Sequence, residues 1–389
     1  MSSARSTECV DLVCSSPGTR RHVKIHTWGR PGAYRVYIQA SLHADEIPGL
    51  LVANHLMKLL DDANLRKEIV GEVVIVPFAN PIGLSQQLNG HHLGRFCFET
   101  GQNFNRDWID CTDTVAEAVT GKLTADAAEN IKMIRQAIYD CVSQKEALEE
   151  DVYLKKLLLE RACVSDVCLD LHCDGDAVLH MYTHDRLWPQ LADLSQEIGT
   201  ECQIVDSDSG GNCFDEACMN IWARLADKFP TFPIPMGCEA STVELRGQDL
   251  VYDDIARTDA LALYRFLQRR GVVLCSPYSP PYTYFSTPPA LEITVRSPSP
   301  LTAVDMVKSP CAGVVAWLVR PGAEVVEGQV LGEIVNVDDV DAPRVAVVSR
   351  TTGIVFGMRN HKLVRPGQII IKVAGTVPLP WRSGKLLTS

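Results

Sequence analysis

The sequence predicts an α/β fold with a mostly parallel, mixed sheet and helices on both faces, followed by a small C-terminal all-β barrel-sandwich domain. Two observations support the first part. Short β-branched segments alternate with longer segments of helical period over roughly the first 290 residues. Some of these short segments, such as residues 71–78, are apolar apart from Glu72, as is typical of parallel strands that are covered on both faces. A third observation predicts the second domain, because beyond a proline-rich connector the chain contains only short β segments punctuated by Gly and Pro-Gly.

Four strand-like segments in the first part lead directly into polar residues. His43 and Glu46 follow the first segment, His172 follows the third, and Glu244 lies at the end of the fourth. Ligands bind beyond the carboxyl ends of strands in open α/β sheets, so we expect these side chains to meet at one edge of the sheet. The four segments are residues 33–40, 71–78, 166–171 and 241–245.

Helical patterns lie between these strands. Pro48 opens one over residues 49–63, because proline suits the first turn of a helix. Residues from about 124 to 161 have the period of one or two long helices, which is too long for a simple connection. We interpret this segment as an insertion that caps the pocket or forms a subunit contact. Residues 263–274 are interpreted as the closing helix and strand.

The remainder of the chain has a different texture. Residues 276–289 are rich in proline and favour an extended connector, so we divide the chain into residues 1–290 and 291–389. Residues 309–337 and 349–375 form a twofold β repeat that resembles the barrel-sandwich of biotinyl and lipoyl carrier domains. Such carriers modify a lysine between the halves, but residues 336–348 contain none. We therefore expect no biotin or lipoate, and a role as a structural cap or assembly module.

Composition excludes several classes of function. The net charge of −11, without a long Lys/Arg stripe, argues against nucleic-acid binding. No run of about 18 apolar residues indicates a membrane span, and the N-terminus lacks the apolar core of a signal peptide. We expect a cytoplasmic protein. The 14 cysteines are scattered without a C-x-x-C pair, so neither a disulfide framework nor a zinc ribbon is indicated, and reduced thiols are expected.

The polar residues at the strand ends have the composition of a hydrolytic zinc centre. His43 and Glu46, three residues apart, can converge on one cation, and His172 completes a set of two histidines and one carboxylate. Such a set leaves Zn²⁺ a position for water, which the metal activates at neutral pH. We expect one Zn²⁺ per chain, with Asp45 and Asp170 orienting the ligand histidines.

These residues resemble the succinylglutamate desuccinylase/aspartoacylase family, which is akin to the zinc carboxypeptidases. The resemblance covers roughly the first 290 residues. It rests on H-x-x-E at His43 and Glu46, on His172 about 126 residues further on, on Asn105-Arg106, and on Glu244 in VELRG. The family has an open sheet with helices on both faces, which agrees with the fold that the residue pattern predicts.

The resemblance implies a role for each matching residue. Glu244 would act as general base and then general acid, although it could instead pair with Arg246. Asn105 and Arg106 would bind a substrate carboxylate, since guanidinium matches two oxygens; otherwise Arg106 pairs with Asp107 or Asp110. The developing oxyanion needs a positive partner. Arg95 is the candidate because relatives carry an arginine upstream of Asn-Arg, and Arg246 is its rival.

The resulting interpretation is a zinc-dependent amidohydrolase that deacylates an N-acyl amino acid or a related small amide bearing a carboxylate. Its partner would be that small molecule, with no nucleic acid or membrane and with a homo-oligomer as an option. Two alternatives use the same residues. A metallocarboxypeptidase would release a C-terminal residue from a peptide, and a catalytically silent binding or scaffold protein would retain the pocket without turnover.

Overall fold

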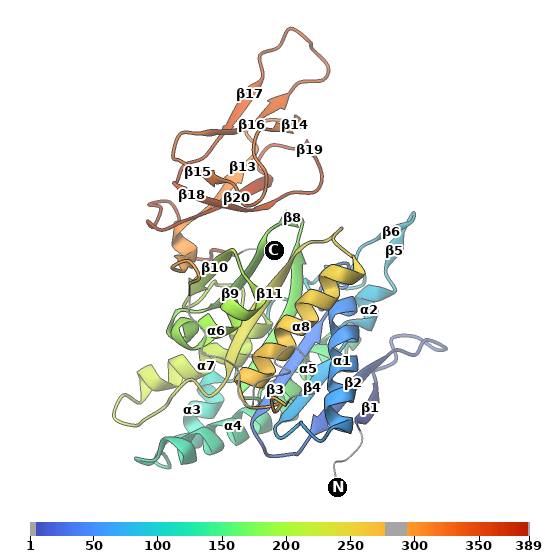
Figure 1. Cartoon of the computed structure of the whole chain (residues 1–389), viewed down its shortest axis with the longest axis vertical. Helices are drawn as coiled ribbons and strands as arrows, with labels where there is room; N and C mark the ends of the chain where they lie inside the picture. The colour runs from blue at the N-terminus through green and yellow to red at the C-terminus, as the bar shows by residue number, and fades with distance from the viewer. Residues whose placement is uncertain (1–4, 277–293, 388–389) are drawn as a thin grey trace.

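The computed structural model describes residues 5–276 and 294–387 of the chain, and a β domain stands on top of a larger α/β domain (Figure 1). The α/β domain contains a nine-stranded sheet in the order β1-β2-β4-β3-β7-β11-β9-β10-β12. Strands β4, β3, β7 and β11 are mutually parallel, as are β9, β10 and β12, and antiparallel pairs join β1 to β2, β2 to β4 and β9 to β11. The prediction of a mostly parallel mixed sheet is confirmed. The strands are β1 (Ser6–Asp11), β2 (His22–Gly29), β3 (Arg35–Ala40), β4 (Glu72–Val76), β7 (Val167–Asp174), β9 (Leu179–His184), β10 (Cys202–Asp206), β11 (Glu239–Gly247) and β12 (Ser299–Pro300).

Helices cover both faces of this sheet. Helices α1 (Pro48–Leu65), α6 (Trp188–Ile198) and α8 (Asp253–Arg269) pack together on one face, in front of the sheet in Figure 1. Helices α3 (Thr112–Val119), α4 (Ala127–Gln144), α5 (Glu150–Ala162) and α7 (Phe214–Lys228) pack on the other. The remaining short elements are α2 (Pro81–Leu84), the hairpin β5 (Gln87–Leu88) and β6 (His91–His92), β8 (Asp176–Ala177), and the 3₁₀ turns η1 (Asp185–Leu187) and η2 (Leu301–Ala303).

The segment expected to be a helical insertion is the pair α4 and α5. The start of α4 follows from its cap, because the Asp126 carboxylate accepts hydrogen bonds from the backbone N–H groups of Ala128 and Glu129. Its buried positions, such as Ile134 and Ile138, recur at helical spacing and face the core. The prediction of one or two long helices in this segment is confirmed, and the structure has two.

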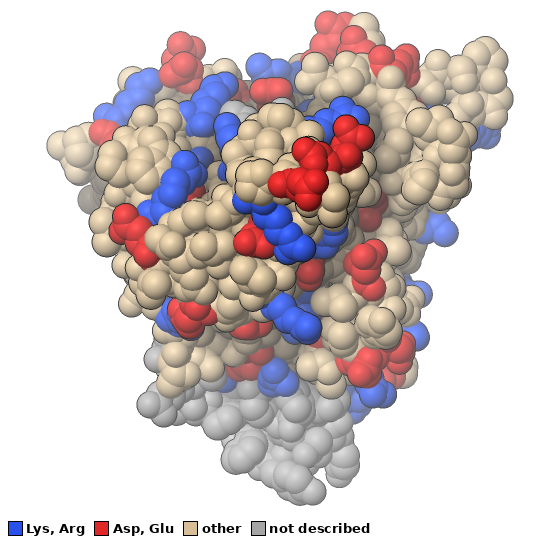
Figure 2. Space-filling model, turned by 90° about the horizontal axis from the view of Figure 1, so that it is seen from above, with Lys and Arg blue, Asp and Glu red and all other residues tan. Residues whose placement is uncertain are grey.

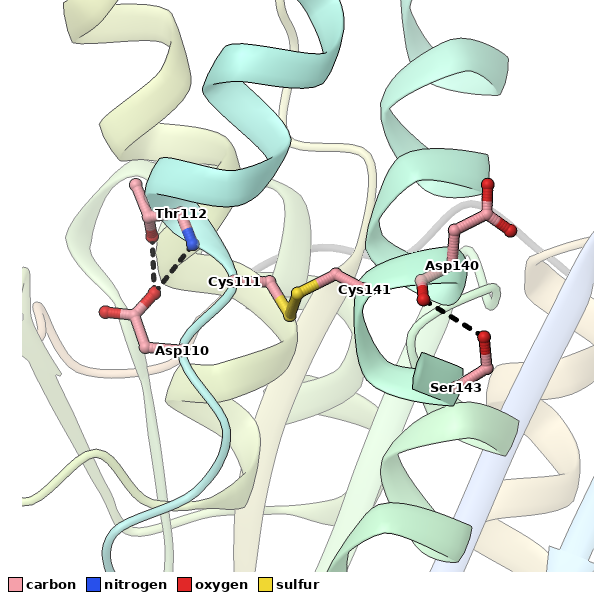
Figure 3. The surroundings of a disulfide bond; sticks show 6 residues. All are labelled: Asp110, Cys111, Thr112, Asp140, Cys141 and Ser143. Carbon is pink, nitrogen blue, oxygen red and sulfur yellow. Dashed lines mark hydrogen bonds between the residues drawn. A yellow bond between two sulfur atoms is a disulfide. The ribbon is translucent and has the colours of Figure 1, made fainter. Parts of the chain in front are cut away.

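One pair of cysteines corrects the expectation of reduced thiols. Cys111 and Cys141 form a disulfide between the residue before α3 and the last part of α4, with Cα atoms 6.2 Å apart (Figure 3). Their separation of 30 residues carries no recognisable motif, and only the packing of α3 on α4 brings them together. The other cysteines are free thiols.

The C-terminal domain consists of two antiparallel sheets around its own apolar core. Strands β14, β15 and β16 are repeated as β18, β19 and β20, and each short middle strand pairs with the other half: β15 with β18, and β19 with β14. This exchange explains the twofold repeat in the sequence. The boundary predicted at residues 290 and 291 lies outside the described residues. The strands are β13 (Val304–Lys308), β14 (Gly313–Trp317), β15 (Glu324–Val325), β16 (Val330–Val335), β17 (Val345–Val348), β18 (Gly353–Met358), β19 (Leu363–Val364) and β20 (Ile369–Gly375).

The two domains are joined by strand pairing and by a shared apolar cluster. Strand β8 of the α/β domain pairs with β18, and β12 adds to the large sheet beside β10. Val178 and Ile204 pack in one buried cluster with Leu301, Phe356 and Leu386. Because backbone hydrogen bonds and buried apolar surface both cross this boundary, the β domain is fixed relative to the α/β domain.

His180 lies at this domain boundary and predicts sensitivity to acid. Its ring packs edge-on against Phe356 at 5.1 Å between centroids, Nδ1 donates to the Val178 carbonyl, and Nε2 is buried without a hydrogen-bonding partner. Burial lowers the pKa of His180 to about 4, although the negative charge of Asp174 opposes that shift.

The pKa of His180 is lower in the folded state than the value of about 6.5 expected in the unfolded chain. Its contribution to stability is therefore complete above pH 6.5 and is lost as the pH falls towards 4, by about 3 kcal/mol in total. We expect His180→Leu to lose less stability between pH 7 and pH 4.5 than the unmodified protein, measured by urea unfolding. Parallel pH profiles for the two proteins would contradict this assignment.

The described helices and one face of the molecule can be compared with the expectations about membranes and nucleic acids. Among the described residues, no helix is both long and apolar enough to cross a membrane. On the face seen in Figure 2, Lys and Arg side chains are interspersed with Asp and Glu. That mixed pattern differs from the single-sign stripe by which nucleic-acid-binding surfaces are recognised.

Candidate metal centre

Two neighbouring strands and one sharp turn bring the predicted residues together. After β3, Ser41 adopts a positive φ of 63° and turns the chain, so that His43 and Glu46 sit just before α1. Non-glycine residues with a positive φ are uncommon, and they cluster at functional sites. In the register of β7 and β11, His172 lies directly beside Glu244. All four residues therefore lie at the carboxyl edge of the parallel strands, as the sequence predicts.

His43, Glu46 and His172 form a buried cluster with the geometry of a metal site. Their potential ligand atoms all lie within 4.8 Å of one another. One oxygen of Glu46 is 3.1 Å from His43 Nδ1, and the other is 2.7 Å from His172 Nδ1. Two Nδ1 atoms and one carboxylate thus converge on a single point.

The second nitrogen of each histidine is held by another buried side chain. His43 Nε2 lies 2.8 Å from Asn103 Oδ1, and His172 Nε2 lies 2.8 Å from Asp170 Oδ2. Because both partners are oxygen acceptors, each Nε2 is the nitrogen that donates a proton outward, which leaves each Nδ1 as the atom that would bind a cation in the cluster. Such outer hydrogen bonds fix the tautomer and the ring orientation of metal-binding histidines.

Asp170 belongs to a longer buried chain of hydrogen bonds. Tyr37 Oη donates to Gln39 Oε1 over 2.8 Å, and Gln39 Nε2 donates to Asp170 Oδ1 over 3.0 Å. The prediction that Asp170 orients a histidine is confirmed. The same prediction for Asp45 is wrong, because within the described residues its buried Oδ1 has no hydrogen-bonding partner at all.

The charges of the cluster show what a cation would neutralise. Burial lowers the pKa of His43 to about 4, and the positive charge of Arg95 adds to this effect. Burial also opposes the charge on His172, but Asp170 and Glu46 together outweigh it and hold the pKa of His172 well above its usual range. The carboxylates of Asp170 and Glu46, one at each ring nitrogen, therefore favour the positively charged form of His172. A divalent cation would neutralise the same negative charges.

Glu244 lies beside the cluster with no partner of its own. Its Oε2 is buried and makes no hydrogen bond among the described residues. Burial, followed by the negative charge of Glu46, raises the pKa of Glu244 to about 8. The alternative pairing with Arg246 is wrong, because Arg246 donates to Asp259 over 2.8 Å and turns away at a positive φ of 65°.

Arg95 reaches the cluster from a loop that crosses the His43 turn. Its Nη1 lies 3.1 Å from His43 Nδ1 and 3.3 Å from Glu46 Oε1. Gly94 permits this crossing, since a Cβ atom there would lie only 2.4 Å from the Asp45 nitrogen. Arg95 is therefore the arginine close to the ligands, whereas its rival Arg246 is bound to Asp259.

Asn105 and Arg106 lie on the same side of the site. Asn105 Oδ1 accepts from the Phe214 N–H at the start of α7, and Nδ2 lies 3.4 Å from His172 Nε2. Arg106 Nη1 donates to the Asn105 carbonyl over 2.6 Å, while its Nε is buried and unpaired. Arg106 has no acidic partner among the described residues. The sequence analysis gave an ion pair between Arg106 and Asp110 as an alternative. This alternative is wrong, because Asp110 pairs with Arg224.

These residues open into a cavity of about 1190 Å³ between the two domains. The α/β domain contributes His43, Glu46, His172 and Glu244, with Arg95, Asn105 and Arg106. The β domain contributes the opposite wall, including Met358, Lys372 and the C-terminal residues Leu386 and Leu387. The expectation that this domain is only a structural cap or assembly module is therefore incomplete, because it also forms part of the pocket.

The helical insertion does not reach this cavity. None of its described residues is among those that line it. Instead, Lys155 on α5 donates to the Arg106 carbonyl over 2.7 Å and so supports the loop behind the site. The interpretation of the insertion as a cap over the pocket is thus wrong, since α4 and α5 pack with α3 and α7 and contribute no residue to the cavity lining.

Sequence reasoning missed two residues of this site. Asn103 forms a hydrogen bond with His43 Nε2. Its position two residues before Asn105 in GQNFNR is the feature of the sequence that could have indicated it as a site residue. Lys372, on β20, forms an ion pair with Asp174 beside the cluster. No local pattern could reveal Lys372, because 200 residues separate it from His172 and the contact depends on domain packing.

The arrangement of the site can now be compared with known proteins. Residues 33–270 match the family model described as the succinylglutamate desuccinylase/aspartoacylase catalytic domain, which is more than half of the chain. The chain belongs to the succinylglutamate desuccinylase/aspartoacylase family. The candidate metal-centre residues His43, Glu46 and His172 all lie inside the matched range. No curated protein matches the sequence.

Solved structures share the whole fold, including the β domain. A succinylglutamate desuccinylase/aspartoacylase-type protein from Shewanella frigidimarina NCIMB 400 superposes with a TM-score of 0.83 at 22% identity, over 98% of this chain and 100% of that one. A family protein from Shewanella amazonensis SB2B gives 0.81 at 23%, over 95% and 98%. The product-bound ectoine utilization protein EutE (DoeB) from Ruegeria pomeroyi gives 0.63 at 15%, over 96% and 95%. At these identities the likeness concerns the fold, and chemistry must be argued from the site.

Proposed function

We propose that this family member is a zinc-dependent amidohydrolase that removes the acyl group from an N-acyl amino acid or a related small amide bearing a carboxylate. One observation carries the proposal. A three-residue donor cluster, the Glu244 carboxylate with its buried unpaired Oε2, and the Arg106 guanidinium, which has no acidic partner among the described residues, all line one cavity. Isolated charges of this kind are costly unless a ligand completes them, so their convergence supports a substrate site.

The donor set suits one Zn²⁺ per chain. Two imidazoles with fixed tautomers and one carboxylate are ligands that zinc prefers, and three protein ligands leave a position open. When bound there, zinc would supply a Lewis acid that makes water acidic near neutral pH and polarises a carbonyl.

Glu244 would move the protons of the reaction. As a carboxylate it accepts a proton from the attacking water, and as the resulting acid it delivers that proton to the departing nitrogen. The negative charge that develops on the carbonyl oxygen needs a positive partner, and Arg95 lies near enough to the cluster to provide it. Arg106 would hold the substrate carboxylate with its planar pair of N–H donors, and Asn105 fixes the loop from which Arg106 reaches out.

The wall formed by the β domain supports a small amide over the alternative of a peptide. A metallocarboxypeptidase needs an open groove in which a peptide can lie, whereas here Met358, Lys372 and Leu387 face the site across the cavity. The silent scaffold remains the other alternative. Cytoplasmic location and oligomeric state stay predictions.

Incubation with a panel of substrates tests the proposal. The zinc-loaded full chain is mixed with N-acetyl- and N-succinyl-amino acids and, separately, with short peptides, and the products are followed by mass spectrometry. Loss of acyl groups supports the proposal. Release of C-terminal residues from peptides would favour the carboxypeptidase, and bound zinc with no hydrolysis in either panel would favour the scaffold.

Arg106→Lys separates substrate binding from chemistry. We expect KM for the preferred amide to rise about tenfold or more, with kcat changed only a few-fold, because a lysine ammonium cannot reproduce the two parallel hydrogen bonds. Arg224→Lys is the matched control, since Arg224 pairs with Asp110 and Asp208 outside the cavity. An unchanged KM for Arg106→Lys, measured by steady-state kinetics, would remove Arg106 from the carboxylate site.

A further inference from the structure

One corner of the cavity is apolar and belongs neither to the metal centre nor to the polar residues around it. Tyr182, Met306, Leu386 and Leu387 line the cavity and also pack together in the apolar cluster at the domain boundary. We name these four residues the apolar corner. Three of them come from the region after residue 293, so the β domain and its C-terminal segment provide most of this surface.

The apolar corner is tied to the Arg106 side of the site. The backbone N–H groups of Leu386 and Leu387 both donate to the Ser209 carbonyl, over 2.8 and 3.2 Å. Gly211 lies two residues further along the same loop and is close to both Arg106 and Leu387. A Cβ atom at Gly211 would lie 3.0 Å from Arg106 Cδ and 3.2 Å from the Leu387 carbonyl oxygen. The guanidinium and the apolar corner are therefore close neighbours.

Two polar groups on the adjacent wall are already engaged, whereas Arg359 is available for a second carboxylate. Lys372 is occupied by its ion pair with Asp174. The Asn360 amide donates to Gln248 over 3.3 Å. Arg359 also lines the cavity and has no ion-pair partner among the described residues, so a second carboxylate bound at Arg359 is the competing arrangement that a test must detect.

The size of the cavity also favours a substrate with a large side chain. At about 1190 Å³ it exceeds the range of about 300 to 1000 Å³ in which drug-sized ligands usually bind. An N-acetyl derivative of a small amino acid would leave much of that space unfilled. A large side chain would fill the space and remove the apolar corner from water.

From these observations, and resting on the proposed function, we infer that the substrate is an N-acyl derivative of an amino acid with a large apolar side chain. In a substrate whose α-carboxylate binds Arg106, the side chain and the amide nitrogen both branch from the Cα atom that carries this carboxylate. When the scissile amide faces the metal centre, the side chain is the branch that is left to reach the apolar corner next to Arg106.

A comparison of substrates on the zinc-loaded full chain tests the inference without any variant. We expect kcat/KM for N-acetyl-leucine, N-acetyl-methionine and N-acetyl-phenylalanine to exceed that for N-acetyl-alanine and N-acetyl-aspartate by about tenfold or more, since apolar pockets discriminate at roughly that level per group. Preference for N-acetyl-aspartate or N-acetyl-glutamate would overturn the inference, while leaving the proposed deacylation intact.

Leu387→Ser then tests the corner itself. Leu387 is half-buried at the cavity wall, and Val377→Ser is a matched control because Val377 is 70% exposed and does not line the cavity. We expect Leu387→Ser to lower the ratio of kcat/KM between N-acetyl-leucine and N-acetyl-aspartate about tenfold, and Val377→Ser to leave that ratio unchanged. An equal effect of Leu387→Ser on both substrates would overturn the inference.

Binding to Glu244→Gln protein, measured by calorimetry, separates failure of this inference from failure of the proposed function. Tighter binding of N-acetyl-leucine than of N-acetyl-aspartate supports the apolar corner even if the native enzyme hydrolyses neither amide. Equal or reversed affinities would overturn the inference whatever the hydrolysis results show.

Discussion

Glu244→Gln is expected to lower kcat for the preferred amide by about 10³-fold, while the protein still binds one zinc per chain. Glutamine keeps the size of the side chain and its place on β11 beside His172, but it cannot accept a proton from water. General acid-base groups contribute about 10² to 10⁴ in rate, and Glu244 would serve in both proton transfers. Steady-state kinetics and metal analysis on the same preparation measure the two quantities.

The matched control for this variant is Glu239→Gln. Glu239 lies at the other end of the same strand and pairs with Arg270, far from the metal ligands. We expect it to leave kcat within a few-fold of the native value. If Glu244→Gln retained native kcat, or lost its zinc along with its activity, the role of Glu244 as proton carrier would be wrong.

His172→Ala is expected to abolish both zinc binding and hydrolysis. With two protein ligands left, the cluster keeps one imidazole and one carboxylate, which no longer define a closed three-ligand set. In the native protein, zinc at one hundred times its Kd should stabilise the fold by about 3 kcal/mol, because only the folded state holds the ligands together. The variant should show no zinc-dependent rise in Tm.

His55→Ala is the control for the metal experiment, because His55 lies on α1 and bonds to Asp253. It should bind zinc and gain Tm like the native protein. Zinc content is measured after dialysis, together with thermal unfolding with and without added zinc. A His172→Ala protein that still held one zinc per chain would show that the metal lies elsewhere.

The strand-end residues could be predicted because their chemistry and their place in the fold depend on local patterns. His43, Glu46 and His172 follow apolar strand segments, and parallel strands bring such residues to one edge. Asp170 could be predicted for the same reason, since alternation along β7 places it on the same face as His172, two residues away. The roles of these residues in metal binding and catalysis remain predictions.

Other residues of the site could not be predicted, because they depend on contacts between segments far apart in the chain. Asn103 binds His43 only because its loop folds back across the turn, and Cys111 meets Cys141 only where α3 packs on α4. Asp45 shows the opposite case. It stands between two site residues in the sequence, yet its carboxylate makes no hydrogen bond to a ligand histidine.

By itself, the sequence determined the mixed α/β sheet, the β repeat and the set of residues at the strand ends, because each follows from short-range periodicity and from side-chain chemistry. Only the tertiary structure decided that α4 and α5 lie away from the pocket, that Arg246 is bound to Asp259, and that Leu387 joins Arg106 at one cavity. Those outcomes depend on how buried surfaces of distant elements fit together. Packing of that kind minimises the free energy of the whole chain, and no window of neighbouring residues contains it.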